Sequence, residues 1–182
     1  MLLKIIERSR NVAESMSKGG QFLLKKNKVA HISGHGRLID PGTVEVTDKD
    51  GKKENISANN IILATGARSK ELPNLKQDGK RIIGYREALS LKKQPESMLV
   101  IGSGAIGSEF AHFYNAIGTR VILVELLPNV VPLEDEDVSK QLERSFKKAG
   151  ITVFTNASVE SINTSGRKCK VKVKTGKDIE TH

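Results

Sequence analysis

The sequence predicts an α/β fold for residues 96–182, on three observations. The apolar runs 98–101 and 121–124 show no polar alternation, as expected for parallel strands covered on both faces. Each run is followed by a segment in which apolar residues recur at helical spacing. A third apolar run, 151–154, completes the order β-α-β-α-β, which is the half-unit of a Rossmann fold.

The two helices of this unit have recognisable faces and ends. The apolar stripe of the first helix is Ile106, Phe110, Phe113 and Ile117, closed by Gly118. The second helix begins in an acidic turn, 134–137, and ends at Lys147, Lys148 and Gly150, so both ends suit the helix dipole. Its predicted stripe is Val138, Leu142 and Phe146.

Alternating polar and apolar residues then predict an antiparallel β-meander over 157–163, 168–174 and 177–182. The sequence stops within the last of these strands. We therefore expect a Rossmann-type domain that is truncated at its C-terminal end.

The first half of the chain predicts a different arrangement. Apolar residues at helical spacing from Leu2 to Met16 predict a helix that ends at Gly19–Gly20. A glycine-broken strand over 29–39 precedes a hairpin over 43–57, and an apolar strand over 59–69 stops at a small-residue turn. Periodicity is lost from 72 to 95, which predicts a connection and a domain boundary near Pro95.

The composition of the 182 residues limits the function classes. The formal net charge of +9 could attract nucleic acid, but the basic residues occur as scattered pairs and the chain has no tryptophan to stack on bases. We expect a solvated basic surface and no nucleic-acid partner. No apolar run approaches the roughly 18 residues of a membrane span. Lys4 interrupts the only stretch that resembles a leader, so we expect no membrane partner and a cytoplasmic location.

Gly102, Gly104 and Gly107 match the pattern G-x-G-x-x-G, which alone occurs often by chance. Here a predicted strand precedes the pattern and a predicted helix follows it. The first glycine permits a tight turn, the second allows a pyrophosphate to approach the backbone, and the third lets the helix pack on the strand. The N–H groups of the helix would face the phosphates. The sequence therefore predicts a dinucleotide site at this loop, with a simple strand-to-helix turn as the alternative.

Glu125 ends the second strand about 20 residues after the glycines, where an acid accepts hydrogen bonds from the adenosine ribose. A carboxylate there would repel a 2′-phosphate, and the following segment ELLPNVVP offers no arginine to bind one. We therefore predict NAD(H) over NADP(H). A surface glutamate at a strand end is the alternative.

Other chemistries have little support in the sequence. Cys169 is the single cysteine, in the alternating segment KCKVKVK, which favours a structural thiol. The four histidines, of which His112 is expected on a helix surface, show no ligand spacing, so we predict no metal site. Ser103 and Ser108 lack the nearby histidine and acid that a nucleophilic serine requires. No catalytic residue is assigned.

Four segments together resemble the dihydrolipoamide dehydrogenase family of pyridine nucleotide-disulfide oxidoreductases. They are NNIILATGARS, ALSLKKQPE, MLVIGSGAIGSEF and VILVELLPNVVPLEDED. The likeness extends over nearly the whole chain. It implies a partial FAD-binding domain over 1–95 and an NAD-binding Rossmann domain over 96–182.

The resemblance also implies roles for individual residues. Those implied to lie against FAD are Gly36, Thr65, Gly66 and Ala67. Those implied to bind NAD are Gly102, Ser103, Gly104, Ala105, Ile106, Gly107, Glu109, Glu125 and the backbone near Val159. A plain structural role is an open alternative at several of these positions: an ordinary strand-end turn for Thr65 and Gly66, a glycine between strands for Gly36, a strand core position for Val159 and an exposed helix residue for Glu109.

The sequence also departs from the family. The first glycine fingerprint, the redox cysteine pair, the later FAD-binding motif and the dimerisation domain with its His-Glu pair are all missing. We therefore expect an inactive internal fragment, with FAD bound only in the full-length enzyme. The implied parent is a homodimer that acts on protein-bound lipoyl groups of 2-oxo acid dehydrogenase or glycine cleavage complexes. The alternatives are another flavoenzyme of the superfamily, such as an NADH oxidase or peroxidase, and a non-catalytic nucleotide-binding module.

Overall fold

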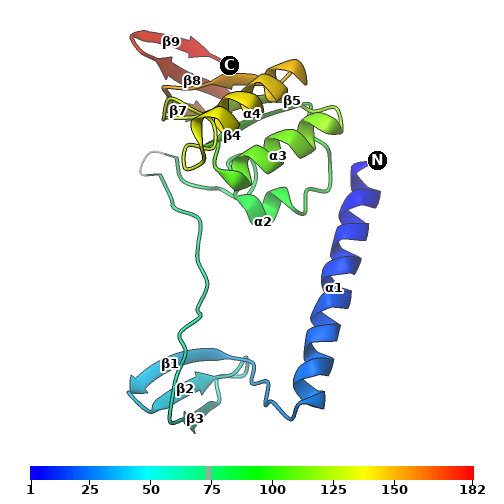
Figure 1. Ribbon diagram of the computed structural model, residues 1–182, viewed down its shortest axis with the longest axis vertical. Helices are drawn as coiled ribbons and strands as arrows, with labels where there is room; N and C mark the ends of the chain where they lie inside the picture. Colours follow the sequence, from blue (N-terminus) through cyan, green and yellow to red (C-terminus); the bar gives the residue numbers. More distant parts are fainter. Residues whose placement is uncertain (73–74) are drawn as a thin grey trace. The chain divides into compact units, whose positions relative to one another are not determined.

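The structure is a computed structural model that describes residues 1–72 and 75–182, and it divides into two compact units. Unit 1 comprises Met1–Glu7 and Ser69–His182, and unit 2 comprises Arg8–Arg68. Figure 1 shows their elements along the chain. Residues 73–74 of the predicted connection lie outside the described residues.

The predicted boundary near Pro95 differs from the division between these units. The short helix α2 (Tyr85–Ala88) lies in unit 1, where Ala88 is buried in the main core and its carbonyl accepts a hydrogen bond from the hydroxyl of Tyr114. Partly buried Leu91 packs against the same core. The segment 72–95 thus lacks periodicity but still contains apolar residues that pack against the domain that follows.

The parallel sheet of unit 1 has the predicted order of elements. Its strands are β4 (Ser97–Ile101), β5 (Arg120–Val124) and β6 (Thr152–Phe154), paired in parallel in the order β4-β5-β6. Helix α3 (Ala105–Ala116) connects β4 to β5, and α4 (Glu136–Lys148) connects β5 to β6. The predicted β-α-β-α-β unit is confirmed.

One layer covers each face of this sheet, which explains why β5 is apolar from Val121 to Val124. Val121 and Leu123 are buried with the residues of α3 and α4 in one core. Val124 is buried in a second core with Val171 and Val173 of the β-meander. The meander consists of β7 (Ala157–Asn163), β8 (Lys170–Thr175) and β9 (Asp178–Thr181), as predicted. Each fully buried valine or leucine contributes about 1.5–3 kcal/mol.

The predicted helix stripes are only partly right. Phe146 of α4 is buried, but Val138 is exposed, and Ile106 at the start of α3 is 61% exposed. The buried residues of α3 are Ser108, Ala111 and Tyr114. Tyr114 is fully buried there, and the other three predicted residues of α3 are half-buried against the same core: Phe110, Phe113 and Ile117.

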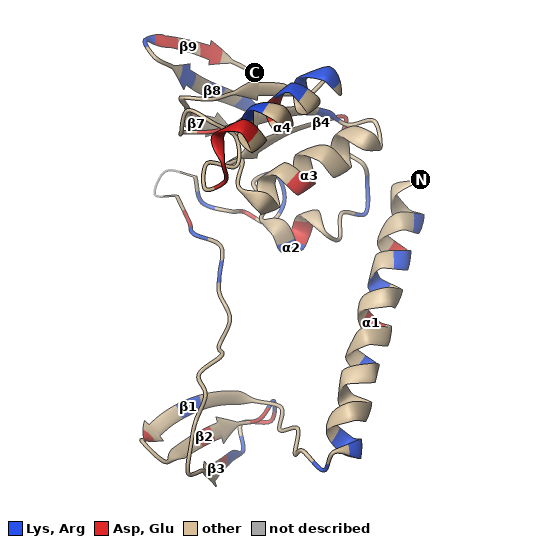
Figure 2. Ribbon diagram, viewed as in Figure 1, with Lys and Arg blue, Asp and Glu red and all other residues tan. Residues whose placement is uncertain are grey.

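The ends of α4 are built as the charge pattern predicts. Asp135 is the N-cap, and its Oδ1 accepts a hydrogen bond from the N–H of Asp137 at 2.9 Å. Acidic residues occupy the first turn and Lys147 and Lys148 the last, and Figure 2 shows the two colours at opposite ends of the helix. Both placements are favourable in the field of the helix dipole.

Unit 2 contains most of α1 (Leu2–Lys26) and one antiparallel sheet, ordered β1-β2-β3. Its strands are β1 (His35–Asp40), β2 (Thr43–Thr47) and β3 (Lys53–Ser57). The hairpin between β2 and β3 turns at Gly51, whose φ of 82° lies in the left-handed region that glycine tolerates. Within the described ranges, no helix combines the length and apolar character needed to cross a membrane.

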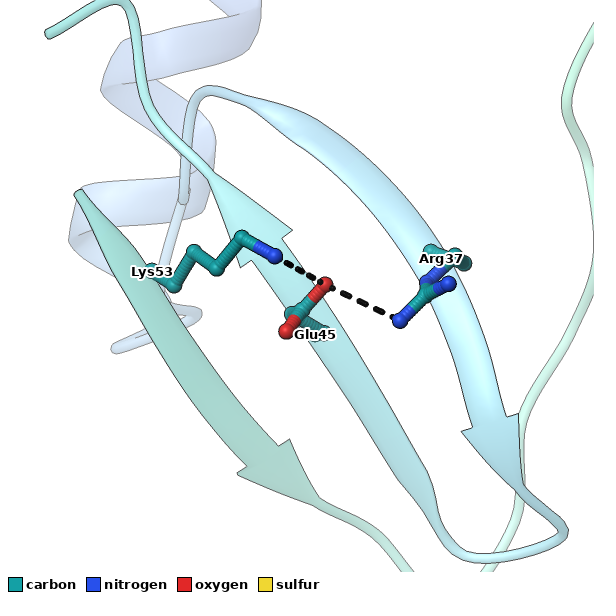
Figure 3. Close-up of polar contacts among 3 residues, drawn as sticks. All are labelled: Arg37, Glu45 and Lys53. Atoms are coloured by element: carbon teal, nitrogen blue, oxygen red, sulfur yellow. Dashed lines mark hydrogen bonds and ion pairs between the residues drawn. The ribbon is translucent and has the colours of Figure 1, made fainter. Parts of the chain in front are cut away.

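Charge pairs connect the three strands of this small sheet, as Figure 3 shows. Glu45 of the central strand accepts from Arg37 on one side at 3.4 Å and from Lys53 on the other at 3.3 Å. The two basic side chains are largely exposed, so each pair contributes little stability, about 0–1 kcal/mol.

Two predictions for the first half of the chain are wrong. Helix α1 continues through Gly19 and Gly20 to Lys26, because glycine lowers helix propensity by about 1 kcal/mol without breaking the backbone hydrogen bonds. The predicted strand over 59–69 is irregular, and Ile62 and Leu63 are 91% and 71% exposed. A strand requires a hydrogen-bonded partner, and none of the described strand pairings includes this segment.

Candidate functional site

The candidate site begins where β4 passes into α3. Gly102 donates a backbone hydrogen bond to the carbonyl of Val124 at 2.8 Å, so the turn is joined to the end of the neighbouring strand β5. The φ of Gly102 is 91°, a conformation that side chains disfavour. This residue thus meets the conformational requirement that the motif predicts for its first glycine.

The other two glycines differ in what a side chain would meet. A Cβ at Gly107 would lie 1.9 Å from the carbonyl oxygen of Gly102, so only glycine lets α3 approach β4 this closely. A Cβ at Gly104 would meet nothing within 4 Å. Close packing therefore explains Gly107, whereas the space beside Gly104 is open.

The N-terminus of α3 borders this open space. Gly104 is the N-cap in an extended conformation, and no side chain caps the helix there. The first intrahelical bond runs from the N–H of Ser108 to the carbonyl of Gly104, so the N–H groups of residues 105–107 have no partner within the helix. Ala105 and Ile106 are exposed. Such a helix end favours an anion.

Glu125 lies beside the turn with its carboxylate already hydrogen-bonded. Its Oε2 accepts from the N–H and the hydroxyl of Ser103 at 2.7 and 2.8 Å, and its Oε1 accepts from the N–H of Leu127 at 2.9 Å. The residue is 6% exposed. Burial opposes ionisation, but the hydrogen bonds from Leu127 and Ser103 outweigh it and hold the pKa of Glu125 below its ordinary value. The end of β5 therefore carries a negative charge at neutral pH.

Ser103 joins three parts of the site. It has no exposed surface, and its N–H and hydroxyl both contact Glu125. Its carbonyl oxygen accepts from the hydroxyl of Ser108 at 2.8 Å and from the N–H of Val131 at 3.0 Å. The glycine turn, the acid and the loop before α4 are thereby connected.

Sequence reasoning missed Leu127 and Val131, which contribute only backbone groups to this network. Val131 has a φ of 40°, which is rare for a β-branched residue, and its own carbonyl accepts from the N–H of Glu134 at 2.9 Å. No side-chain pattern in the sequence signals such a backbone contact. Only the position of Ser108 beside the glycines could have suggested that its hydroxyl belongs to this network.

The remaining predicted residues occupy several elements. Glu109 is exposed on α3, and half-buried Val159 of β7 packs against the meander core. In unit 2, Gly36 pairs with Val46 within the sheet. Thr65, Gly66 and Ala67 lie in the irregular segment, where Gly66 has a φ of 76°. Among the described residues, no group of three or more potential metal-ligating side chains gathers, and His112 is exposed on α3.

The parallel strands, the glycine turn at a helix N-terminus and the buried acid at the end of the next strand define a Rossmann-type α/β protein. Within that class, the chain belongs to the pyridine nucleotide-disulphide oxidoreductase family, whose match covers residues 2–182. FAD and NAD(H) are the cofactors of dihydrolipoyl dehydrogenases and related flavoprotein disulfide reductases in this family.

Curated relatives named dihydrolipoyl dehydrogenase match most of the chain. The protein from Chlorobaculum tepidum is 47% identical over 90% of this chain and 35% of its own length. That from Zymomonas mobilis is 45% identical over 87% of this chain and 34% of its own length. The chain thus spans about a third of the length of these relatives.

Solved structures share the fold. LpdA from Mycobacterium tuberculosis is 32% identical with a TM-score of 0.88, covering 98% of this chain and 40% of its own. The HOCl-induced flavoprotein disulfide reductase RclA from Escherichia coli is 23% identical with a TM-score of 0.79. The match covers 97% of this chain and 40% of the RclA chain. At 23% identity, this likeness is evidence for a shared fold only.

Proposed function

We propose that this chain is the NAD(H)-binding portion of a flavin-dependent dihydrolipoamide dehydrogenase. The observation that carries the proposal is the ionised carboxylate of Glu125, held against a glycine turn that leaves open space at Gly104. The relatives named dihydrolipoyl dehydrogenase, at 45–47% identity, support the choice of enzyme. In the parent enzyme the bound cofactors supply hydride transfer from reduced FAD to NAD⁺.

The residues of the turn suit the pyrophosphate of NAD(H). Backbone N–H groups at the start of α3 would hold the phosphates, and the missing side chain of Gly104 would let them approach. Ala105, Ile106 and the segment up to Glu109 would line the same approach. The backbone near Val159 belongs to the proposed site through the family resemblance.

Glu125 would distinguish the two nicotinamide coenzymes. Its carboxylate can accept hydrogen bonds from the ribose hydroxyls of NAD(H). The same charge would repel the 2′-phosphate of NADP(H), and the lowered pKa of Glu125 keeps that charge in place throughout the neutral range. We therefore assign NAD(H) as the ligand.

Unit 2 would belong to the FAD side of the parent enzyme. Gly66, in its left-handed conformation, allows a ligand to approach the backbone closely, and the hydroxyl of Thr65 can hydrogen-bond. Together with Ala67 and Gly36 they form the proposed FAD contacts.

The substrate side of the reaction requires groups that this chain does not contain. Cys169 is its single cysteine, so an intramolecular disulfide cannot form within it. We propose that the parent is a cytoplasmic homodimer that oxidises protein-bound dihydrolipoyl groups of 2-oxo acid dehydrogenase or glycine cleavage complexes. The chain alone should bind NADH weakly and oxidise no dihydrolipoamide.

Calorimetry of the purified chain with NADH and with NADPH tests the coenzyme assignment. We expect weak binding of NADH and weaker binding of NADPH. Tighter binding of NADPH than of NADH would contradict the role given to Glu125. Oxidation of dihydrolipoamide by the chain alone would contradict the proposal that the substrate side of the reaction requires groups that this chain does not contain. Salt-sensitive retention on DNA or RNA would instead favour a nucleic-acid function.

A further inference from the structure

Ser103 stands out in the candidate site because it is completely buried and all of its polar groups contact the protein. Its two donors, the N–H and the hydroxyl, point to the same oxygen, Oε2 of Glu125. Its carbonyl oxygen accepts from Val131 and Ser108. A residue arranged in this way has no polar group left for a ligand, so its effect on a ligand must pass through Glu125.

We propose that Ser103 is a positioning residue that fixes the carboxylate of Glu125 and thereby sets the preference for NADH over NADPH. This inference rests on the proposed function. Three donors, two from Ser103 and one from Leu127, determine the plane of the carboxylate. A carboxylate fixed in this plane presents its remaining acceptor sites in one direction, and it cannot turn away from a 2′-phosphate that approaches from there.

The anchor of Ser103 is itself rigid. Val131 adopts a left-handed φ of 40° and donates its N–H to the Ser103 carbonyl at 3.0 Å. Such a conformation costs free energy for a β-branched residue, and it persists only where surrounding contacts hold it. The carboxylate therefore rests on a residue that the loop before α4 holds through the N–H of Val131, and this contact remains when the hydroxyl of Ser108 is removed.

The substitution Ser103→Ala removes the hydroxyl and leaves the backbone N–H. The hydrogen bond is lost in the free chain and in the complex alike, so only part of its worth should appear in the affinity, and we expect NADH binding to weaken roughly 3- to 30-fold. The affinity for NADPH should fall less or even rise, because the carboxylate only repels its 2′-phosphate and a less fixed carboxylate can turn away. The ratio of NADH affinity to NADPH affinity should therefore fall, by roughly 3- to 30-fold if the affinity for NADPH is unchanged.

Ser108→Ala is the matched control. It also removes one buried serine hydroxyl at 2.8 Å from its acceptor, but that acceptor is the Ser103 carbonyl and not Glu125. If disturbance of the turn alone mattered, both variants would weaken NADH and NADPH equally, because the two coenzymes share the pyrophosphate. We expect this equal change, with an unaltered ratio, for Ser108→Ala only.

Two further measurements complete the test, and the first of them does not depend on coenzyme binding. NMR titration of the Glu125 carboxyl without coenzyme should show its pKa rising in Ser103→Ala and staying lower in Ser108→Ala. In a double-mutant cycle, Ser103→Ala should not change the affinity ratio once Glu125→Gln is present, because the positioned charge is gone.

The possible outcomes separate the inference from the proposed function. If the wild-type chain binds NADH and Ser103→Ala leaves both the affinity ratio and the Glu125 titration unchanged, only the inference is overturned. If the wild-type chain binds neither coenzyme, the proposed function fails and the inference fails with it. A reduced ratio together with a raised pKa in Ser103→Ala, and neither change in Ser108→Ala, supports the inference.

Discussion

Replacement of Gly107 by alanine tests whether the glycine turn depends on close contact between α3 and β4. The new Cβ would lie 1.9 Å from the Gly102 carbonyl oxygen, 3.0 Å from its carbon and 3.4 Å from Cγ1 of Val100. To restore an ordinary contact of 3.4 Å, the helix must move away by about 1.5 Å, the difference from the 1.9 Å approach. The obstructing atom is backbone, so no side-chain rotation relieves the collision.

The expected loss of stability combines two opposing effects. Overpacking of this kind typically costs 1–3 kcal/mol, and we expect the upper end, about 3 kcal/mol, because backbone must shift. Alanine has a higher helix propensity than glycine by about 1 kcal/mol, which offsets part of this cost. The net loss of about 2 kcal/mol should lower the melting temperature by roughly 4–8 °C in a chain of this size.

Thermal unfolding followed by circular dichroism measures this change, with Gly104→Ala as the matched control. An added Cβ at Gly104 meets nothing within 4 Å, and its extended backbone accepts alanine. The control should melt within about 2 °C of the wild type, since an unobstructed surface substitution changes stability by no more than about 0.5 kcal/mol. It should nevertheless bind NADH less tightly, because the Cβ fills the ligand's approach. A Gly107→Ala variant with the melting temperature of the wild type would refute the packing argument.

Three further substitutions test the contacts around the site. Glu125→Gln should lower the unfolding free energy by about 1–3 kcal/mol at pH 7. The lowered pKa stabilises the fold above the ordinary value of 4.5, so in urea titrations this difference should shrink as the pH falls below 4.5, and a difference that grows in acid would contradict the assignment. Asp135→Ala removes the cap on Asp137 and should cost about 1 kcal/mol by urea unfolding; no loss would argue against capping. Tyr114→Phe leaves the buried carbonyl of Ala88 unpaired and should cost about 1–2 kcal/mol by the same measurement, whereas an unchanged value would mean that α2 is not held there.

The parallel sheet could be predicted because its strands carry a local signal. In β5 every position from Val121 to Val124 is apolar, and the structure covers both faces of this strand. The charges at the two ends of α4 are equally local, since a capping acid acts on the N–H two residues later. Predictions of this kind depend on neighbouring residues only, so the sequence alone is sufficient for them.

The errors fall where distant partners decide the outcome. Ile62 and Leu63 have the composition of a strand, yet the described strand pairings leave them without a hydrogen-bonded neighbour. The stripe of α3 was predicted from its large apolar residues, whereas its fully buried face also includes the small residues Ser108 and Ala111 beside Tyr114. The closeness of the helix to β4, which no periodicity reveals, selected the small side chains.

The candidate site shows both kinds of information in one place. The spacing from Gly102 to Glu125 predicts an acid at the end of the neighbouring strand, because parallel strands bring their carboxyl ends to one edge. The orientation of that acid depends on the buried hydroxyl of Ser103 and on the N–H of Val131, which holds the Ser103 carbonyl. Val131 meets this requirement with a backbone conformation that its β-branched side chain disfavours. In the proposed site, coenzyme preference would follow from the acid and from the buried residues that hold it, so a glutamate at this position would discriminate less well without that support.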